Sequence, residues 1–269
     1  MHQSHTRILR LLASVALTGG LALAAAGCKT VDMPDVTGAL GPTSAAAAEP
    51  DGRRDVDTWA ARYRANPRDV ETAIQYARVL RESGQRSQAV AVLEQSAIRD
   101  PDNKKLLGAY GRALADVGNY SQALEVLGRA HTPDQPDWHI LSAQGAVLDQ
   151  MGRHQEAQRY YASALKIAPD EPSVLSNLGL SYALAKDLHK AEATLRRAVG
   201  QGKGDPRVRQ NLALVVGLQG RFADAETIAR ADLPPEEAAA NVAYLRQMLS
   251  KEGDWKKLAR PATPTNPGG

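Results

Sequence analysis

Cys28 is the only cysteine in the chain of 269 residues, and it directly follows the small residues Ala25, Ala26 and Gly27. A thiol is a nucleophile in its thiolate form. Because no second cysteine exists to pair with it, this thiol cannot close a disulfide within the chain, and the domain that follows must be stable without covalent cross-links. Cys28 is therefore a candidate for covalent modification, and the segment before it indicates which kind.

Residues 1–27 have the layout of a secretory signal peptide. Arg7 and Arg10 lie in a start without acidic residues, and an apolar run extends from there to Gly27. This run is short for a transmembrane helix, which needs about 20 apolar residues, and Gly19 and Gly20 interrupt it at a cost in helix propensity. We therefore predict export followed by cleavage.

The end of this segment, Ala25-Ala26-Gly27-Cys28, resembles the lipobox of bacterial lipoproteins. The family prefers leucine where this chain has Ala25, although alanine is tolerated there. The resemblance implies that Cys28 accepts diacylglycerol, becomes the acylated N-terminus and attaches the protein to a membrane, since several acyl chains anchor stably. Lys29 follows where an aspartate would favour retention in the inner membrane, so the resemblance implies a periplasm-facing outer-membrane protein of the bacterial cell envelope.

No other residues form a recognisable constellation for catalysis or for binding a cofactor. The six histidines lack metal-ligand spacing, and none of the motifs GxSxG, GxxxxGK[ST] or HExxH occurs. The histidines are His2, His5, His131, His139, His154 and His189. We therefore expect no enzyme activity, no metal, no cofactor and no small-molecule substrate.

The charge balance argues against a nucleic-acid-binding protein. Without the two arginines of residues 1–27, the chain has 31 basic and 30 acidic residues, a net charge of +1. A nucleic-acid-binding domain would show clustered Lys and Arg, whereas charges of both signs are interspersed here. We expect protein partners instead.

From about residue 70 to residue 232, the sequence repeats with a period of 34 residues. Each unit has an alanine early in its second helix, a residue five positions earlier that is glycine in four units of five, and a small residue in its first helix. The alanines are Ala89, Ala123, Ala157, Ala191 and Ala225. The turn residues are Gly84, Gly118, Gly152, Lys186 and Gly220. The small residues are Ala77, Gly111, Gly145, Gly179 and Ala213.

Each series has a physical cause. Glycine adopts the left-handed conformation that ends a helix, and small residues allow two helices to cross closely. This pattern resembles the tetratricopeptide repeat, which implies an all-α solenoid of antiparallel helix pairs, with flanking capping helices to cover its ends. We assign residues 1–27 to the signal peptide, 28–54 to a flexible tether, 55–69 to an N-terminal capping helix, 70–233 to five repeats, 234–259 to a C-terminal capping helix and 260–269 to a disordered tail.

A solenoid of this kind presents a groove lined by the first helices of its units. The repeat register places nine candidate partner-binding residues there: Arg78, Lys105, Arg112, Asn177, Leu180, Arg207, Gln210, Asn211 and Leu214. We expect the groove to be basic near its N-terminal units and more apolar toward its C-terminal ones, which suits a segment with an acidic end and an apolar stretch. The alternative for each polar residue is an ordinary solvated surface. Trp138, at the head of the third unit, is expected to be a packing residue.

The carboxylate clamp of chaperone-binding repeat proteins is not expected. Asn177, Arg207 and Asn211 could supply part of it, but Ser142 and Ala146 stand where a lysine and an asparagine are needed.

The whole arrangement, with DLPPEEAAANVAYLRQML at residues 232–249, resembles the TadD family of lipoproteins of tight-adherence (Flp) pilus assembly. The resemblance implies a non-catalytic, pilotin-like helper of an outer-membrane secretin or of another secretion component. Two alternatives share the same anchor and fold. One is a general envelope adaptor for peptidoglycan enzymes, and the other is a component of outer-membrane protein assembly.

Overall fold

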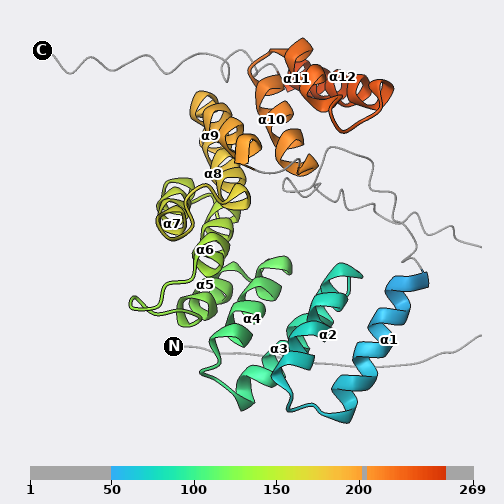
Figure 1. The fold of residues 1–269 in the computed structure, drawn as a ribbon, viewed down its shortest axis with the longest axis vertical. Helices are drawn as coiled ribbons and strands as arrows, with labels where there is room; N and C mark the ends of the chain where they lie inside the picture. The colour runs from blue at the N-terminus through green and yellow to red at the C-terminus, as the bar shows by residue number, and fades with distance from the viewer. Residues whose placement is uncertain (1–49, 202–204, 253–269) are drawn as a thin grey trace, which may run out of the picture. The chain divides into compact units, whose positions relative to one another are not determined.

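The computed structural model describes residues 50–201 and 205–252, and the regular structure in these ranges is helical (Figure 1). The helices are α1 (Pro50–Ala65), α2 (Val70–Glu82), α3 (Arg86–Arg99), α4 (Lys104–Asp116), α5 (Tyr120–Arg129), α6 (Trp138–Gln150), α7 (His154–Ile167), α8 (Pro172–Leu184), α9 (Leu188–Gln201), α10 (Pro206–Leu218), α11 (Phe222–Ala229) and α12 (Pro235–Glu252). The predicted signal peptide, Cys28, most of the predicted tether, residues 253–259 and the predicted tail lie outside the described residues.

The helices from α2 to α11 form five pairs, and the predicted period is confirmed to the residue. The first helices of the pairs (α2, α4, α6, α8 and α10) begin at residues 70, 104, 138, 172 and 206, and the second helices (α3, α5, α7, α9 and α11) begin at residues 86, 120, 154, 188 and 222. Each first helix packs against the second helix of its own pair, and successive first helices also pack against one another. This arrangement confirms the predicted all-α fold of paired helices, with α1 and α12 flanking the pairs.

A capping side chain begins every first helix. At each of these starts, the residue before the helix accepts a hydrogen bond from a backbone N–H two or three residues further on, which satisfies a donor that has no partner within the helix. The capping residues are Asp69, Asn103, Asp137, Glu171 and Asp205. They recur with the same period of 34, so the caps help to hold the helix starts in register.

The turn inside each pair is a helix end with one residue in the left-handed conformation. Gly152, for example, has a φ of 73°, and the N–H of Arg153 donates to the carbonyl oxygen of Leu148 at 2.9 Å. This is the bond pattern of a Schellman motif. Lys186 takes the same place in the fourth pair with a φ of 66°, which costs a side chain bearing a Cβ more than it costs glycine.

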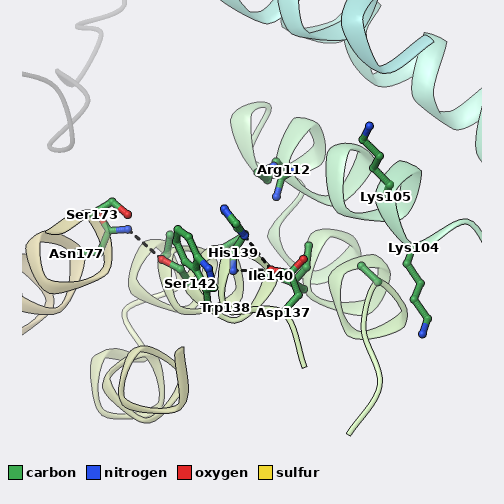
Figure 2. A pocket seen from close by; sticks show the side chains of 13 residues that line it. Lys104, Lys105, Arg112, Asp137, Trp138, His139, Ile140, Ser142, Ser173 and Asn177 are labelled. Carbon is green, nitrogen blue, oxygen red and sulfur yellow. Dashed lines mark hydrogen bonds and ion pairs between the residues drawn. The ribbon is translucent and has the colours of Figure 1, made fainter. Parts of the chain in front are cut away.

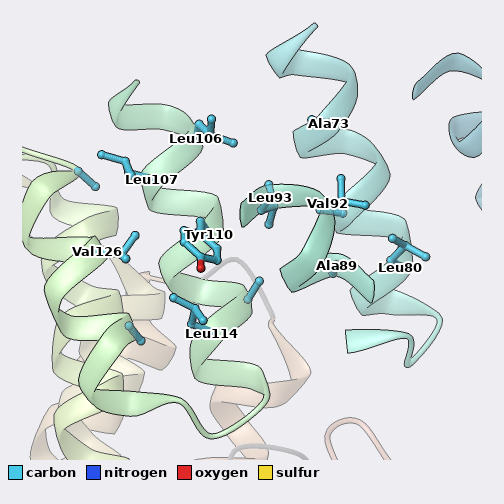
Figure 3. Packing of buried hydrophobic residues seen from close by; sticks show 14 of the residues in the cluster. Ala73, Leu80, Ala89, Val92, Leu93, Leu106, Leu107, Tyr110, Leu114 and Val126 are labelled. Atoms are coloured by element: carbon cyan, nitrogen blue, oxygen red, sulfur yellow. The ribbon is translucent and has the colours of Figure 1, made fainter. Parts of the chain in front are cut away.

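The small residues of the first helices lie where the two helices of a pair cross. A Cβ atom on Gly145 would lie 2.7 Å from Cε1 of Tyr161, and one on Gly179 would lie 2.6 Å from Cγ of Leu195. Both distances are too short for non-bonded carbon atoms. The buried leucines between the pairs then complete the core, as Figure 3 shows for Leu80, Leu93 and Leu114.

Three elements differ in length from the regular pattern. Helix α1 begins at Pro50, so residues 50–54, assigned to the tether, are helical, in keeping with the preference of proline for a first helical position. Helix α5 ends at Arg129, four residues before Pro133, and residues 130–137 form a linker with an isolated bridge between Thr132 and Gln135. Helix α11 is also short, and Pro234 and Pro235 follow it closely.

Candidate protein-binding pocket

A pocket of about 580 Å³ lies on the first helices in the middle of the array, where α4, α6 and α8 are neighbours (Figure 2). It is lined by Lys104, Lys105, Arg112, Ala130, Asp137, Trp138, His139, Ile140, Ser142, Ala143, Ala146, Ser173 and Asn177. Three of the nine predicted partner-binding residues meet here, namely Lys105, Arg112 and Asn177. The other six do not line the pocket: Arg78, Leu180, Arg207, Gln210, Asn211 and Leu214.

The predicted cations differ in whether a carboxylate already pairs with them. Lys105 lines the pocket, but its ammonium group pairs with Glu71 of the preceding unit. Arg78 pairs with Glu82 at 3.1 Å, and Arg207 lies 3.6 Å from Asp205, the residue that caps its own helix. These three cations therefore have neighbours that screen them at the surface.

Arg112 is held differently, because its guanidinium is partly buried. Burial lowers the pKa of Arg112, and the nearby charge of Arg81 lowers it further, while Asp137 and Asp116 act in the opposite direction. Figure 2 shows the side chain reaching from α4 toward the pair formed by His139 and Asp137 at the start of α6. Arg112 therefore brings a positive charge to the wall of the pocket.

The start of α6 supplies an aromatic and polar wall. The rings of Trp138 and His139 stack with centroids 3.5 Å apart and planes inclined by 22°. Nδ1 of His139 lies 3.0 Å from Oδ1 of Asp137. Burial alone would raise the pKa of Asp137, but hydrogen bonds from the backbone N–H and the ring of His139 outweigh it and lower that pKa. Trp138 also packs against the buried cluster that contains Leu141, so it combines the expected packing role with a place in the pocket.

The two predicted asparagines link neighbouring first helices. Nδ2 of Asn177 donates to Oγ of Ser142 at 3.3 Å, and Nδ2 of Asn211 donates to Oγ of Ser176 at 3.0 Å. Each bond joins residues 35 positions apart on successive first helices, so the two bonds are equivalent. These side chains therefore hold the first helices in register, and only Asn177 also lines the pocket.

Two models of the tetratricopeptide repeat match this chain, one at residues 80–145 and 150–215 and the other at residues 206–231. Together they span more than half of the sequence. The chain belongs to the tetratricopeptide repeat family. No curated protein matches it significantly.

Solved structures with the same tetratricopeptide fold include three with moderate structural agreement and low sequence identity. PilW, a widely conserved type IV pilus biogenesis factor, matches with a TM-score of 0.55 and 15% identity over 78% of this chain and 89% of its own. TTC0263, a thermophilic repeat protein of Thermus thermophilus, matches with a TM-score of 0.55 and 22% identity over 60% and 88% of the two chains. A chain of the APC/C hetero-tetramer Cut9-Hcn1 matches with a TM-score of 0.57 and 17% identity over 71% and 40%. These likenesses support the fold.

Several pocket residues of this tetratricopeptide array were not predicted, although the repeat register contains a signal for some of them. His139 and Ser173 occupy the same position in their helices as Lys105 and Arg207, and Ser142 occupies the position of Gln210. Extending the register to every unit would have found them. Ala130 and Asp137 stand at the two ends of the linker between α5 and α6, but they also follow the period, 34 residues after Ser96 and Asn103, so the register contains a signal for them as well.

Within residues 50–201 and 205–252, no cluster of three or more His, Cys, Asp or Glu side chains has a geometry that could hold a metal ion. In the same part of the chain, no helix is both long and apolar enough to span a bilayer.

Proposed function

We propose that this protein is a non-catalytic, lipid-anchored interaction scaffold that acts in the assembly of a pilus or secretion system. The observation that carries the proposal is the pocket on the first helices of a tetratricopeptide array. Proteins of this repeat family generally bind other proteins and do not catalyse reactions. The pocket offers a cation, an aromatic wall and polar groups, which suits a segment of a protein partner.

The proposed anchor is the lipid on Cys28. The basic start, apolar run and small residues before this cysteine support it, and Lys29 supports an outer-membrane position facing the periplasm. An array tethered at a membrane meets partners at the same surface at a raised effective concentration. Weak contacts in the groove would then be sufficient for capture.

The proposed setting is pilus assembly, with a pilotin-like role toward an outer-membrane secretin. Two likenesses support this setting. Residues 232–249 resemble the end of the TadD lipoproteins of tight-adherence (Flp) pilus assembly, and the fold is similar to that of PilW, a type IV pilus biogenesis factor. The resemblance at residues 232–249 carries more weight, because a capping helix of this sequence is not required by the repeat pattern.

Affinity purification from detergent-extracted membranes tests the proposal, with a Cys28→Ala variant in parallel. We expect the native protein to recover a secretin or another pilus secretion component, and the variant to lose the membrane fraction and that partner. Recovery of peptidoglycan enzymes or of the outer-membrane protein assembly machinery, without any pilus component, would refute the pilus setting. An unchanged membrane fraction for Cys28→Ala would refute the lipid anchor.

A further inference from the structure

Arg112 differs from the other arginines of the first helices, because its expected partner is engaged elsewhere. Arg78 occupies the same position one unit earlier and pairs with Glu82, four residues further along its own helix. The equivalent acid for Arg112 is Asp116, but Asp116 pairs with Arg81 of α2. Among the described residues, neither a hydrogen bond nor an ion pair to the Arg112 guanidinium is found.

Gly108 and Ile140 form part of the surroundings of Arg112. Gly108 lies one turn earlier on α4, and a Cβ atom there would meet Cδ1 of Ile140 at 2.6 Å and the Arg112 nitrogens at 3.8 and 3.9 Å. A larger residue would therefore clash with Ile140, whereas its distance to the Arg112 nitrogens is that of ordinary van der Waals contact. Arg112 lines the pocket together with the stacked pair of Trp138 and His139 on α6.

A row of four leucines continues the same face of the first helices beyond the pocket. They occupy two positions four residues apart on each of the last two first helices: Leu180 and Leu184 on α8, and Leu214 and Leu218 on α10. In α2 and α4 the same two positions hold Arg78 with Glu82 and Arg112 with Asp116. Leu184 is 45% exposed and the other three are partly exposed, and none of the four packs into a buried cluster of the described chain.

The leucine row and the pocket are adjacent, because α8 belongs to both. Ser173 and Asn177 on α8 line the pocket, and Leu180 follows one turn later on the same helix. Helix α8 also packs against α10. Neighbouring helices lie about 10 Å apart. Roughly six extended residues, at about 3.3 Å each, therefore span the two helix spacings from α4 to α8.

We propose that Arg112 and the leucine row together bind one segment of a protein partner, with an Asp or Glu side chain on Arg112 and apolar side chains over the leucines. This inference rests on the proposed function, since it specifies the partner of that scaffold. The guanidinium offers paired donors to a carboxylate, and the leucines offer apolar area that water now covers. We place this Asp or Glu within the segment and not at its end, because α2 and α1 continue the array beyond α4 and leave surface for further residues of the segment.

The charges beside Arg112 support an acidic ligand. Lys104 lines the pocket with Arg112, as does Lys105, whose ammonium group pairs with Glu71, whereas Asp137 is the one carboxylate among the lining residues. That carboxylate already accepts hydrogen bonds from the backbone and ring of His139. A ligand carboxylate therefore meets an excess of positive charge at this end of the groove and apolar side chains at the other.

The test uses a random peptide library of roughly sixteen residues, long enough for the span estimated above, displayed with its C-terminus fused so that no free terminal carboxylate is present. The library is selected on the full chain in detergent. Enriched peptides are then synthesised as C-terminal amides, and their Kd is measured by fluorescence anisotropy. We expect the enriched peptides to combine Asp or Glu with apolar residues.

Two variants and two matched controls decide the outcome. Loss of a charge-assisted bond of about 1.5–3 kcal/mol means that Arg112→Gln should raise Kd by about tenfold to a hundredfold. Leu184→Ser should raise it several-fold. Arg159→Gln and Ile98→Ser change exposed residues of second helices, so they should leave Kd within about twofold. Because Arg112 has no ion-pair partner in the described part of the fold, Arg112→Gln should keep the thermal midpoint of the native protein.

Three results would overturn the inference. They are enriched peptides without acidic residues, a Kd that Arg112→Gln changes no more than its control does, and the absence of any enriched peptide. The membrane co-purification separates this inference from the proposed function. If Arg112→Gln still recovers the secretin in full, the inference fails and the pilus role stands. If acidic peptides bind through Arg112 but no pilus component is recovered, the inference stands and the pilus role fails.

Discussion

Asp149 is the most informative residue to replace for stability, because it is the acceptor for three side chains in the core. Its carboxylate is only 8% exposed. Oδ1 accepts from Oγ of Ser181 at 2.8 Å and lies 2.9 Å from Nδ1 of His154, while Oδ2 accepts from the hydroxyl of Tyr161 at 3.0 Å. These contacts join α6 to α7 of its own pair and to α8 of the next.

The loss in free energy of unfolding is estimated from the two hydroxyl groups that Asp149→Ala would leave without this acceptor. Tyr161 is 1% exposed, and burial together with the charge of Asp149 raises the pKa of Tyr161, so its hydroxyl stays protonated and needs an acceptor. Ser181 is completely buried. An unsatisfied buried hydroxyl costs about 1–3 kcal/mol, and removing the buried charge relieves part of its desolvation penalty. We expect Asp149→Ala to lower the free energy of unfolding by about 3 kcal/mol.

Asp149→Asn should have a smaller effect, about 1–2 kcal/mol, because the amide keeps one acceptor oxygen. Tyr161→Phe removes the hydroxyl with little change of shape. In the double variant Asp149→Ala with Tyr161→Phe, the two losses of stability should therefore overlap, with a coupling energy of about 1.5 kcal/mol.

Urea unfolding of the full chain measures these differences. Hydrogen exchange of amides in α6, α7 and α8 shows in which helices stability is lost. This local readout is needed because repeat arrays can depart from two-state unfolding. Glu125→Ala, at an exposed position of α5, is the control and should change stability by less than about 0.5 kcal/mol. A loss below about 1 kcal/mol for Asp149→Ala, or additive effects of Asp149→Ala and Tyr161→Phe, would show that the cluster does not stabilise the core as argued.

Three further predictions concern a turn, an acid and the C-terminal helix. Lys186→Gly should stabilise the protein by about 0.5–1 kcal/mol in urea unfolding, since glycine avoids the left-handed strain of a Cβ, and an unchanged midpoint would contradict this. Burial alone would raise the pKa of Glu192, but hydrogen bonds from a glutamine and two arginines outweigh it and lower that pKa. The stability Glu192 contributes is thus present above the ordinary glutamate value of 4.5 and lost as pH falls through the lowered one. Glu192→Gln should therefore flatten the acid limb of a stability–pH curve. Asp232→Asn should weaken the bidentate pair with Arg209 and speed hydrogen exchange in α12 more than in α2, and equal rates would refute a local role.

The repeat pattern predicted the fold well because one physical requirement recurs in every unit. A helix crossing needs a small residue, so Gly145 faces Tyr161 and Gly179 faces Leu195, and these are the positions that the sequence makes small. A turn needs a left-handed residue, and the predicted positions adopt positive φ, including Lys186. Such requirements place the same residue types at a fixed spacing, and this spacing can be recognised in a single sequence.

The pocket was predictable only in part, because its residues are not subject to those requirements. The register placed Lys105, Arg112 and Asn177 on one side of the first helices, where the structure brings them together. It did not show that Glu71 pairs with Lys105, because that contact joins exposed side chains of different units. It also did not show the course of the linker from Ala130 to Asp137, where the helical period is interrupted.

Two departures from the regular pattern lie around this pocket, namely the early end of α5 and the pairing of Asp116 with Arg81. The crossings inside a pair cannot vary without a clash, as Gly145 shows, so variation is confined to linkers and to the outer positions of the first helices. Helix α5 ends at Arg129, four residues before Pro133, and the linker that follows it runs between Ala130 and Asp137, which both line the pocket. Asp116 pairs with Arg81 of α2, so this carboxylate of α4 does not pair with Arg112 of its own helix. Both changes leave the crossings intact, so the surface of the first helices can vary here at little cost to the stability of the array.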